Sequence, residues 1–181
     1  MMPIQIKTNA YLRLLEPKDA QELFEAVDRN RERLRAWMPW VDGTLSPNDT
    51  LKFIQDTVKG RSEGNYQFAI VQEDCIVGVI GFVRSDTANK SAMIGYWNDE
   101  QAQGQGLITM AVQEILKIGF NELGLNRIVI RAQPVNARSC AVPERLGFTA
   151  EGLEKEAELL NGKFVDLKTY VLLRANWQKT S

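Results

Sequence analysis

The stretch that decides the fold reads Met93-Ile-Gly-Tyr-Trp-Asn-Asp-Glu-Gln-Ala-Gln-Gly-Gln-Gly106 and leads directly into an apolar helical pattern. Residues 93–97 predict a strand, and the polar residues after them predict a loop in which Gly104 and Gly106 carry no Cβ. A strand, a glycine-rich loop and a helix in this order gather unpaired backbone N–H groups at the positive end of the helix dipole, where phosphate oxygens bind. The loop is neither a dinucleotide fingerprint nor a Walker loop, and by itself it is equally typical of an ordinary turn.

The rest of the chain alternates between helical and strand periodicities. Asn161-Gly162 separates two strand patterns and predicts a hairpin with a type I′ turn. Such an order of elements predicts a mixed α/β sheet in one domain that spans residues 1–181. The expected elements are one or two strands (4–15), three helices (17–30, 31–40 and from Pro47), strands (66–70, 75–83 and 93–97), a helix (107–122), a strand (127–132), a helix (136–147) and the hairpin (148–160 and 163–173).

The composition excludes several kinds of chemistry. The 181 residues include 22 Lys and Arg, 23 Asp and Glu, two Cys and no His, for a formal net charge of −1. Without His, the chain has no Ser-His-Asp or Cys-His nucleophile system, no imidazole base and no His-containing metal site, and two Cys cannot form a zinc cluster. We expect no metal, and we expect a carboxylate, Tyr, Lys, Cys or water to carry any proton transfer. The balanced charge argues against a broadly basic nucleic-acid binder.

Several motifs in fixed order carry a family resemblance. The spacing Gln101-x-x-Gly104-x-Gly106 is followed by Asn136-Ala-Arg-Ser139, by Leu146-Gly-Phe148 and by Glu151-Gly152. This series resembles the acetyl-coenzyme A signature of the GNAT superfamily of N-acetyltransferases. The run from Ile94 to Asp166 is similar to the RimL/RimJ-type branch, which acetylates ribosomal-protein serine or alanine α-amines. The resemblance implies a twisted, mostly antiparallel sheet of about seven strands, flanked by helices and splayed at the cofactor site.

The resemblance also implies a site for acetyl-coenzyme A. Its pyrophosphate would lie on the loop and on the start of the following helix, and its pantetheine arm would pair with the strand edge where 93–97 splays from 127–132. A backbone N–H near Tyr96 or Trp97 would stabilise the oxyanion of the attacked thioester. The residues expected to contact the cofactor are Tyr96, Trp97, Gln101, Gln103, Gly104, Gln105, Gly106 and Asn136.

Two residues would assist direct transfer of the acetyl group to an amine. By resemblance, Glu158 is the base and Ser139 lies near the sulfur, where its hydroxyl would hydrogen-bond the leaving thiolate. A simpler interpretation stands beside each role, since Asn136 and Ser139 also fit a helix N-cap pair and Glu158 lies among strand carboxylates that are usually solvated. Trp37 and Trp40 could line an acceptor pocket, although aromatic residues at such spacing are more often core.

These observations predict an acetyl-coenzyme A-dependent N-acetyltransferase that acts on a primary amine, with the N-terminal α-amine of a ribosomal protein as the leading acceptor. A small-molecule amine such as a polyamine, a drug or an amino acid is the alternative acceptor, and a non-catalytic acetyl-coenzyme A-binding module is the alternative class. We further expect a cytoplasmic homodimer without membrane or direct nucleic-acid contacts. Cys75 and Cys140 are both expected to be buried packing residues.

Overall fold

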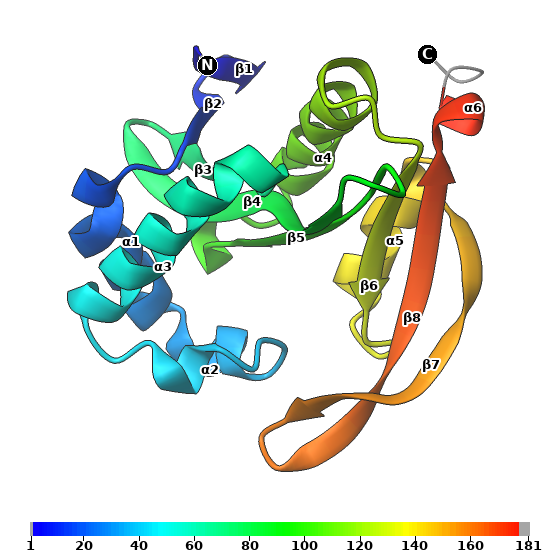
Figure 1. Ribbon diagram of the computed structural model, residues 1–181. Helices are drawn as coiled ribbons and strands as arrows, with labels where there is room; N and C mark the ends of the chain where they lie inside the picture. Colours follow the sequence, from blue (N-terminus) through cyan, green and yellow to red (C-terminus); the bar gives the residue numbers. More distant parts are fainter. Residues whose placement is uncertain (1, 178–181) are drawn as a thin grey trace.

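The computed structural model describes residues 2–177, which form one eight-stranded sheet flanked by helices (Figure 1). The strand order is β1-β2-β3-β4-β5-β6-β8-β7, and every neighbouring pair is antiparallel except β5 and β6, which are parallel. The strands are β1 (Ile4–Lys7), β2 (Ala10–Leu14), β3 (Gln67–Gln72), β4 (Cys75–Asp86), β5 (Ser91–Asn98), β6 (Arg127–Ala132), β7 (Thr149–Leu160) and β8 (Lys163–Leu173). The expected mixed α/β class is confirmed, and the eighth strand arises because residues 4–14 form two strands.

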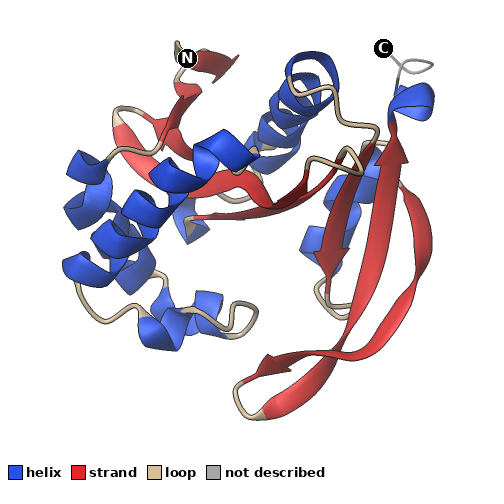
Figure 2. Cartoon of the chain, in the orientation of Figure 1, coloured by secondary structure: helices blue, strands red, loops and turns tan. Residues whose placement is uncertain are grey.

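Helices cover both faces of the sheet. Along β3, Phe68 and Ile70 pack with α4 in the larger core, whereas Ala69 and Val71 pack with α1 and α3 on the opposite face. Such alternation follows from the two-residue period of a strand. The helices are α1 (Ala20–Arg29), α2 (Arg31–Arg35), α3 (Pro47–Gly60), α4 (Leu107–Lys117), α5 (Ala137–Arg145) and α6 (Arg174–Trp177) (Figure 2). Within the described residues, no helix combines the length and apolar character that a membrane crossing requires.

One helix ends earlier than the sequence pattern predicts, and another reaches its predicted end but changes its form on the way. The helix expected over 31–40 ends as α2 at Arg35, because Pro39 cannot donate a backbone hydrogen bond and disfavours a helical residue before it. The helix expected over 107–122 is α-helical only to Lys117 and finishes as a π-helical turn over Ile118–Glu122. The start of α3 matches the prediction, since Ser46 and Asp49 form a reciprocal capping box with Pro47 at the first helical position.

The ladder between β5 and β6 covers only part of β5. Parallel pairing runs from Ser91 opposite Arg127 to Ile94 opposite Ile130, and it stops there. Residues 95–98 continue to pair with β4 on their other side, while β6 continues to pair with β8. The backbone groups of residues 95–98 that point toward β6 are therefore left without sheet partners, which is the splayed edge that the family resemblance implies.

The hairpin of β7 and β8 extends well beyond the rest of the sheet (Figure 1). Its turn has positive φ at both Asn161 and Gly162, as a type I′ turn requires. The side chain of Asn161 donates a 2.9 Å hydrogen bond to the carbonyl of Arg35 at the end of α2. The hairpin tip thus contacts the helical half of the molecule across the opening between β5 and β6.

Gly78 provides a test of how tightly β4 and β5 approach each other. A Cβ at this position would meet the carbonyl oxygen of Trp97 and lie 2.8 Å from the Cα of Asn98, so Gly78→Ala has to push the two strands apart. We expect this variant to lose about 1–3 kcal/mol of unfolding free energy in urea titrations, the usual cost of overpacking. Gly43→Ala is the matched control, because a Cβ there meets nothing within 4 Å. Equal stability of the two variants would contradict the close approach.

Candidate active site

A cavity of about 570 Å³ lies where β5 and β6 diverge. Its walls come from β5, β6, the start of α5, β7 and the segment between α2 and α3, so residues distant in the sequence meet there. The predicted residues that line it are Trp37, Trp40, Tyr96, Trp97, Asn136, Ser139 and Glu158. The glycine-rich loop of residues 101–106 is absent from its lining and lies instead at the end of β5, between that strand and α4.

The glycine-rich loop has the geometry of an anion cradle. Gly104 and Gly106 have φ values of 73° and 78°, which side chains rarely adopt, and a Cβ at Gly104 would meet no atom within 4 Å. No acceptor within residues 2–177 is recorded for the backbone N–H groups of Gly104, Gln105 and Gly106. The first N–H groups of α4 follow immediately and have no helical partners by geometry. Open space, free donors and the helix dipole therefore coincide at one place.

Asp99, together with Arg29 at the end of α1 and Asn30 directly after it, holds this loop in place. Asp99 is buried at the end of β5, where it accepts a 2.5 Å hydrogen bond from Arg29 and a 3.1 Å hydrogen bond from the backbone N–H of Gln101. Burial alone would raise the pKa of Asp99, but the Arg29 guanidinium and the other donors lower it below its ordinary value. Asn30 accepts a 2.9 Å hydrogen bond from the N–H of Glu100. Sequence reasoning missed this anchor, because Arg29 and Asp99 are far apart in the chain.

The loop also contacts α5. The Arg138 guanidinium of α5 donates a hydrogen bond to the side chain of Gln103. Elsewhere in the loop, Gln105 accepts a 2.7 Å hydrogen bond from Gln72 of β3 and donates a 3.1 Å hydrogen bond to the carbonyl of Gln101. Gln101 is anchored through its backbone N–H, which donates to Asp99, and not through its side chain. Arg138 supplies a positive charge beside a loop whose own side chains are neutral, and only its position in the motif Asn136-Ala-Arg-Ser139 could have indicated it.

Glu158 differs from the other carboxylates of β7. Glu151 forms an ion pair with Arg127, and the hydrogen bond from Arg127 is the main cause that lowers the pKa of Glu151. Glu154 forms an ion pair with Arg131, but the hydrogen bond from Thr169 is the main cause that lowers the pKa of Glu154. The register of β7 against β8 shifts between Glu154 and Glu158, and Glu158 turns into the cavity wall. Burial raises the pKa of Glu158, and the positive charges of Arg131 and Arg84 oppose that rise only in part.

Ser139 lies at the start of α5, opposite β5. The Asn136 side chain caps the helix by accepting a 3.2 Å hydrogen bond from the Ser139 N–H, so the predicted N-cap pair is present. The Tyr96 hydroxyl donates a 3.1 Å hydrogen bond to the Ser139 carbonyl, and burial raises the pKa of Tyr96 well above its ordinary value. Tyr96 therefore stays a neutral phenol, and its hydroxyl ties β5 to α5 across the opening.

The two cysteines differ. Cys140 is buried as expected, with its Sγ 3.5 Å from the carbonyl of Gln133. Cys75 is exposed, so the expectation that it packs in the core is wrong. It is the first residue of β4 and follows the turn at Glu73-Asp74, where the strand has not yet entered the core. Neither side chain takes part in the cavity lining.

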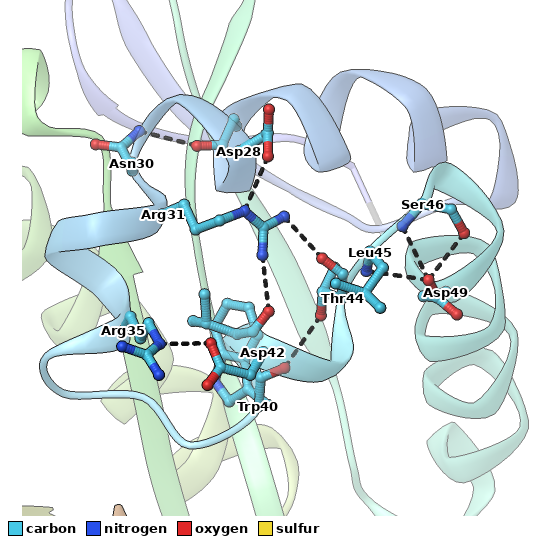
Figure 3. A network of polar contacts seen from close by, with 12 residues as sticks. Asp28, Asn30, Arg31, Arg35, Trp40, Asp42, Thr44, Leu45, Ser46 and Asp49 are labelled. Atoms are coloured by element: carbon cyan, nitrogen blue, oxygen red, sulfur yellow. Dashed lines mark hydrogen bonds and ion pairs between the residues drawn. The ribbon is translucent and has the colours of Figure 1, made fainter. Parts of the chain in front are cut away.

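Trp37 and Trp40 both line the cavity, and a polar network between α2 and α3 includes Trp40 (Figure 3). Arg31 donates hydrogen bonds of 2.9 and 2.8 Å to the carbonyls of Val41 and Thr44, and Arg35 forms a 2.7 Å ion pair with Asp42. The Trp40 and Trp97 rings lie 6.3 Å apart at a tilt of 47°. Trp40 remains 40% exposed, so it is a cavity wall and not a core residue.

Further polar residues outside the predicted set also line the cavity, among them Thr50, Arg84, Arg131 and Gln133. Thr50 Oγ1, Arg131 Nε and Gln133 Nε2 are buried without a hydrogen-bond partner among the described residues. Buried polar atoms in folded proteins are nearly always paired, so unpaired ones along one cavity indicate a place where a bound molecule completes the pairing. Gln133 directly follows β6, and this strand-end position is the one sequence signal that could have found it.

Comparison with known proteins agrees with this geometry. Residues 9–149 match the family model of the acetyltransferase (GNAT) domain. The chain is 34% identical to the ribosomal-protein-serine acetyltransferase of Escherichia coli (strain K12), over 92% of this chain and 94% of that protein. It is also 34% identical, over 98% of both chains, to YdaF of Bacillus subtilis (strain 168), whose name gives it provisionally as a ribosomal N-acetyltransferase.

Two solved structures have closely similar folds. RimL, a ribosomal-protein alpha-N-acetyltransferase in complex with coenzyme A, superimposes with a TM-score of 0.91 at 30% identity, over 95% of this chain and 98% of that chain. The microcin self-immunity acetyltransferase MccE, in complex with acetyl-CoA and AMP, gives a TM-score of 0.86 at 30% identity, over 93% and 94%. The family model, the relatives and the splayed sheet with its glycine loop lead to one conclusion: this chain is a member of the GNAT family of acetyltransferases, which use acetyl-CoA as cosubstrate.

Proposed function

We propose that this enzyme transfers the acetyl group of acetyl-CoA directly to the N-terminal α-amine of a ribosomal protein. The observation that carries the proposal is that Glu158 of β7 and Ser139 of α5 line one cavity at the free edge of β5. The acceptor is suggested by relatives named as ribosomal-protein acetyltransferases, which align with more than nine-tenths of the chain.

The donor half of the site would bind acetyl-CoA chiefly through backbone groups. The free N–H groups of residues 104–106 and the start of α4 would hold the pyrophosphate, and Arg138 would add a positive charge beside it. The edge of β5 after Ile94, which has no strand partner on the side of β6, offers the pantetheine arm the hydrogen bonds of an added strand, although Arg33 already donates to the carbonyl of Asn98. Asn136 and Tyr96 contribute mainly by fixing the position of Ser139.

Chemically, the acceptor nitrogen forms a bond to the acetyl carbon, the bond from that carbon to sulfur breaks, and one proton leaves the nitrogen. Glu158 accepts this proton, directly or through water, and a raised pKa suits a carboxylate to that task. A backbone N–H at Tyr96 or Trp97 donates to the oxyanion that develops on the thioester oxygen. The Ser139 hydroxyl donates a hydrogen bond to the departing thiolate, which needs little further help because a thiol pKa is about 8.5.

A small amine is the second candidate acceptor. The chain is 21% identical to a spermidine N(1)-acetyltransferase of Vibrio cholerae, and the MccE structure contains a nucleotide. Arg84 and Arg131 line the cavity and repel polyamines, which carry several positive charges. A non-catalytic acetyl-CoA-binding module would have no need for a half-buried carboxylate in the cavity, so the presence of Glu158 disfavours that alternative.

The setting of the enzyme follows from the acceptor. A ribosomal protein is available for acetylation in the cytoplasm, so we propose a cytoplasmic enzyme. It would bind the ribosomal protein directly and would need neither nucleic acid nor a membrane. We also propose a homodimer, for which light scattering should give twice the 20.5 kDa mass of one chain. A mass of one chain at micromolar concentration would reject the dimer.

A panel assay tests the proposed acceptor. Purified enzyme with acetyl-CoA should release free thiol with peptides that copy ribosomal-protein N-termini, and mass spectrometry should place the acetyl group on the α-amine. Spermidine and free amino acids should react at least about tenfold more slowly in kcat/KM, a difference of about 1.4 kcal/mol in transition-state binding. Faster turnover of a polyamine than of every peptide would overturn the assignment, and thermal stabilisation by acetyl-CoA without any turnover would favour the binding module.

Replacing Glu158 tests its role as the base. Below the pKa of the acceptor α-amine (about 7.7–8.0), log kcat/KM should fall with decreasing pH, and it should steepen where Glu158 becomes protonated. Glu158→Gln should lower kcat by about 100-fold, the lower end of the range for a general base, because an α-amine needs only modest help. The same substitution should also remove the steeper fall in log kcat/KM at low pH, which reports protonation of Glu158, and leave the shallower fall, which reports protonation of the acceptor amine. Initial rates at varied peptide concentration with saturating acetyl-CoA, measured for both enzymes across the pH range, give the two profiles.

Glu156→Gln is the matched control for that substitution. Glu156 lies two positions away on the same strand and is exposed, and it does not line the cavity. We expect this variant to keep both the rate and the shape of the wild-type profile, with unchanged affinity for acetyl-CoA in calorimetry. If Glu158→Gln also keeps the steeper fall, the base is water or another group, and Glu158 has no part in proton transfer.

A further inference from the structure

Arg84 stands at the cavity without a counter-charge. It belongs to the outer part of β4, its side chain is exposed, and no hydrogen bond or ion pair is recorded for it within residues 2–177. Its charge nevertheless acts on two carboxylates of β7, because it lowers the pKa of both Glu154 and Glu158. Arg84 therefore lies within electrostatic reach of the proposed base while its own donors remain available.

Arg131 is only partly paired. Its Nη1 donates 2.9 Å to Glu154, and Glu154 also accepts a hydrogen bond from Thr169, so this carboxylate is shared between two donors. The Nε of Arg131 is buried and has no partner in the described part of the chain. A planar guanidinium has five donors in a fixed fork, and such a fork matches a carboxylate when one edge is free.

A second hollow adjoins the main cavity, and two carboxylates, Asp86 and Glu154, line it together with three arginines. It has a volume of about 350 Å³, and Arg84, Met93 and Arg131 line both it and the main cavity. Arg127 lines the second hollow as well, but its guanidinium is already bound by both oxygens of Glu151 at 2.8 and 2.6 Å. Among these arginines of the described chain, Arg84 has no ion-pair partner, and Arg131 pairs with Glu154 through Nη1 but leaves its Nε without one.

The charges that line the main cavity also point to the two arginines. The charged residues that line the main cavity, among those described, are Arg84, Arg131 and Glu158. When Glu158 has taken the proton from the acceptor, the two arginines remain as the charged lining residues, and only Arg131 has a carboxylate partner, Glu154, just outside the lining. An acceptor with a further positive charge near its amine would be repelled at that stage, and one with a carboxylate would be attracted.

We propose that Arg84 and Arg131 form an acceptor subsite for a carboxylate, so that the enzyme prefers polypeptide N-termini with Asp or Glu at the second or third residue. This specificity rests on the proposed acetylation of α-amines. An extended peptide advances about 3.3 Å per residue, so a side chain at these positions lies within roughly 7 Å of an α-amine at Glu158. The carboxylate would take the free donors of Arg84 and the free edge of Arg131.

Matched peptides test the subsite. All begin with Ser and differ only at the second or third residue, which is Asp, Asn or Lys in an otherwise neutral sequence. For the wild type we expect kcat/KM to be about five- to tenfold higher for Asp than for Asn, and lower for Lys than for Asn, the scale of one charged hydrogen bond at a partly exposed site. The Asp preference should shrink in 0.5 M salt, about the range in which exposed charges are screened.

Variants assign the preference to the arginines. Arg84→Gln should reduce the Asp-to-Asn ratio to less than about twofold, whereas Arg84→Lys should keep part of it because the charge remains. The ratio is the measured quantity, since a change in the protonation of Glu158 alters both peptides equally and cancels. Arg145→Gln is the control: Arg145 is an exposed arginine at the end of α5 that does not line the cavity, and its loss should leave the ratio unchanged. Thermal melts of each variant verify that it is folded.

The outcomes separate this specificity from the proposed function. Acetylation of all peptides with equal kcat/KM would overturn the carboxylate subsite and leave the α-amine activity standing. A preference for Asp that survives in both Arg84→Gln and Arg131→Gln would also overturn it, because the arginines would then not be its source. If acetyl-CoA binds but no peptide is acetylated, the proposed acceptor fails, and the subsite fails with it.

Discussion

The site depends on one property of the sheet, the short parallel ladder between β5 and β6. Parallel strands cannot be joined by a tight turn, so the chain has to cross over, and α4 is the crossover. A crossover helix begins where its first strand ends, which places the glycine loop and the positive end of α4 at the end of β5. The ladder ends after Ile94, so the free edge of β5 lies directly before that loop. The anion cradle of the glycine loop and the open edge of β5 therefore both follow from the crossover connection between β5 and β6.

The other half of the site comes from segments that the ladder does not control. The β7–β8 hairpin supplies Glu158, and the register shift before that residue separates it from carboxylates that are paired with arginines. The segment between α2 and α3 supplies the tryptophans, held by Arg31 and by the ion pair of Arg35 with Asp42. Burial and charge at Glu158 therefore follow from tertiary contacts and not from its local sequence.

Much of the fold could be predicted from local patterns. The alternation in β3, the capping box at Ser46, the Asn161-Gly162 turn and the strand-loop-helix at 93–106 all depend on near neighbours, and each is present. Exposure was harder to predict, since Cys75 sits in an apolar run but at the exposed first position of its strand. The buried pair of Asp99 and Arg29 could not be predicted, because only the folded chain brings them together. The same holds for Arg84 and Arg131 near Glu158.

The hydrogen bond from Asn161 to Arg35 joins residues 126 positions apart, and it is formed by a turn and a helix end on the proposed acceptor side. The proposed donor side, by contrast, is built almost entirely from the continuous stretch between β5 and α5. Changes in the length or composition of the hairpin tip or of the α2–α3 segment can therefore reshape what the enzyme acetylates without disturbing the parts that would hold acetyl-CoA. Because the two sides are built from separate segments, sequence changes in the hairpin tip and in the α2–α3 segment can give the same fold new acceptors while the acetyl-transfer chemistry stays constant.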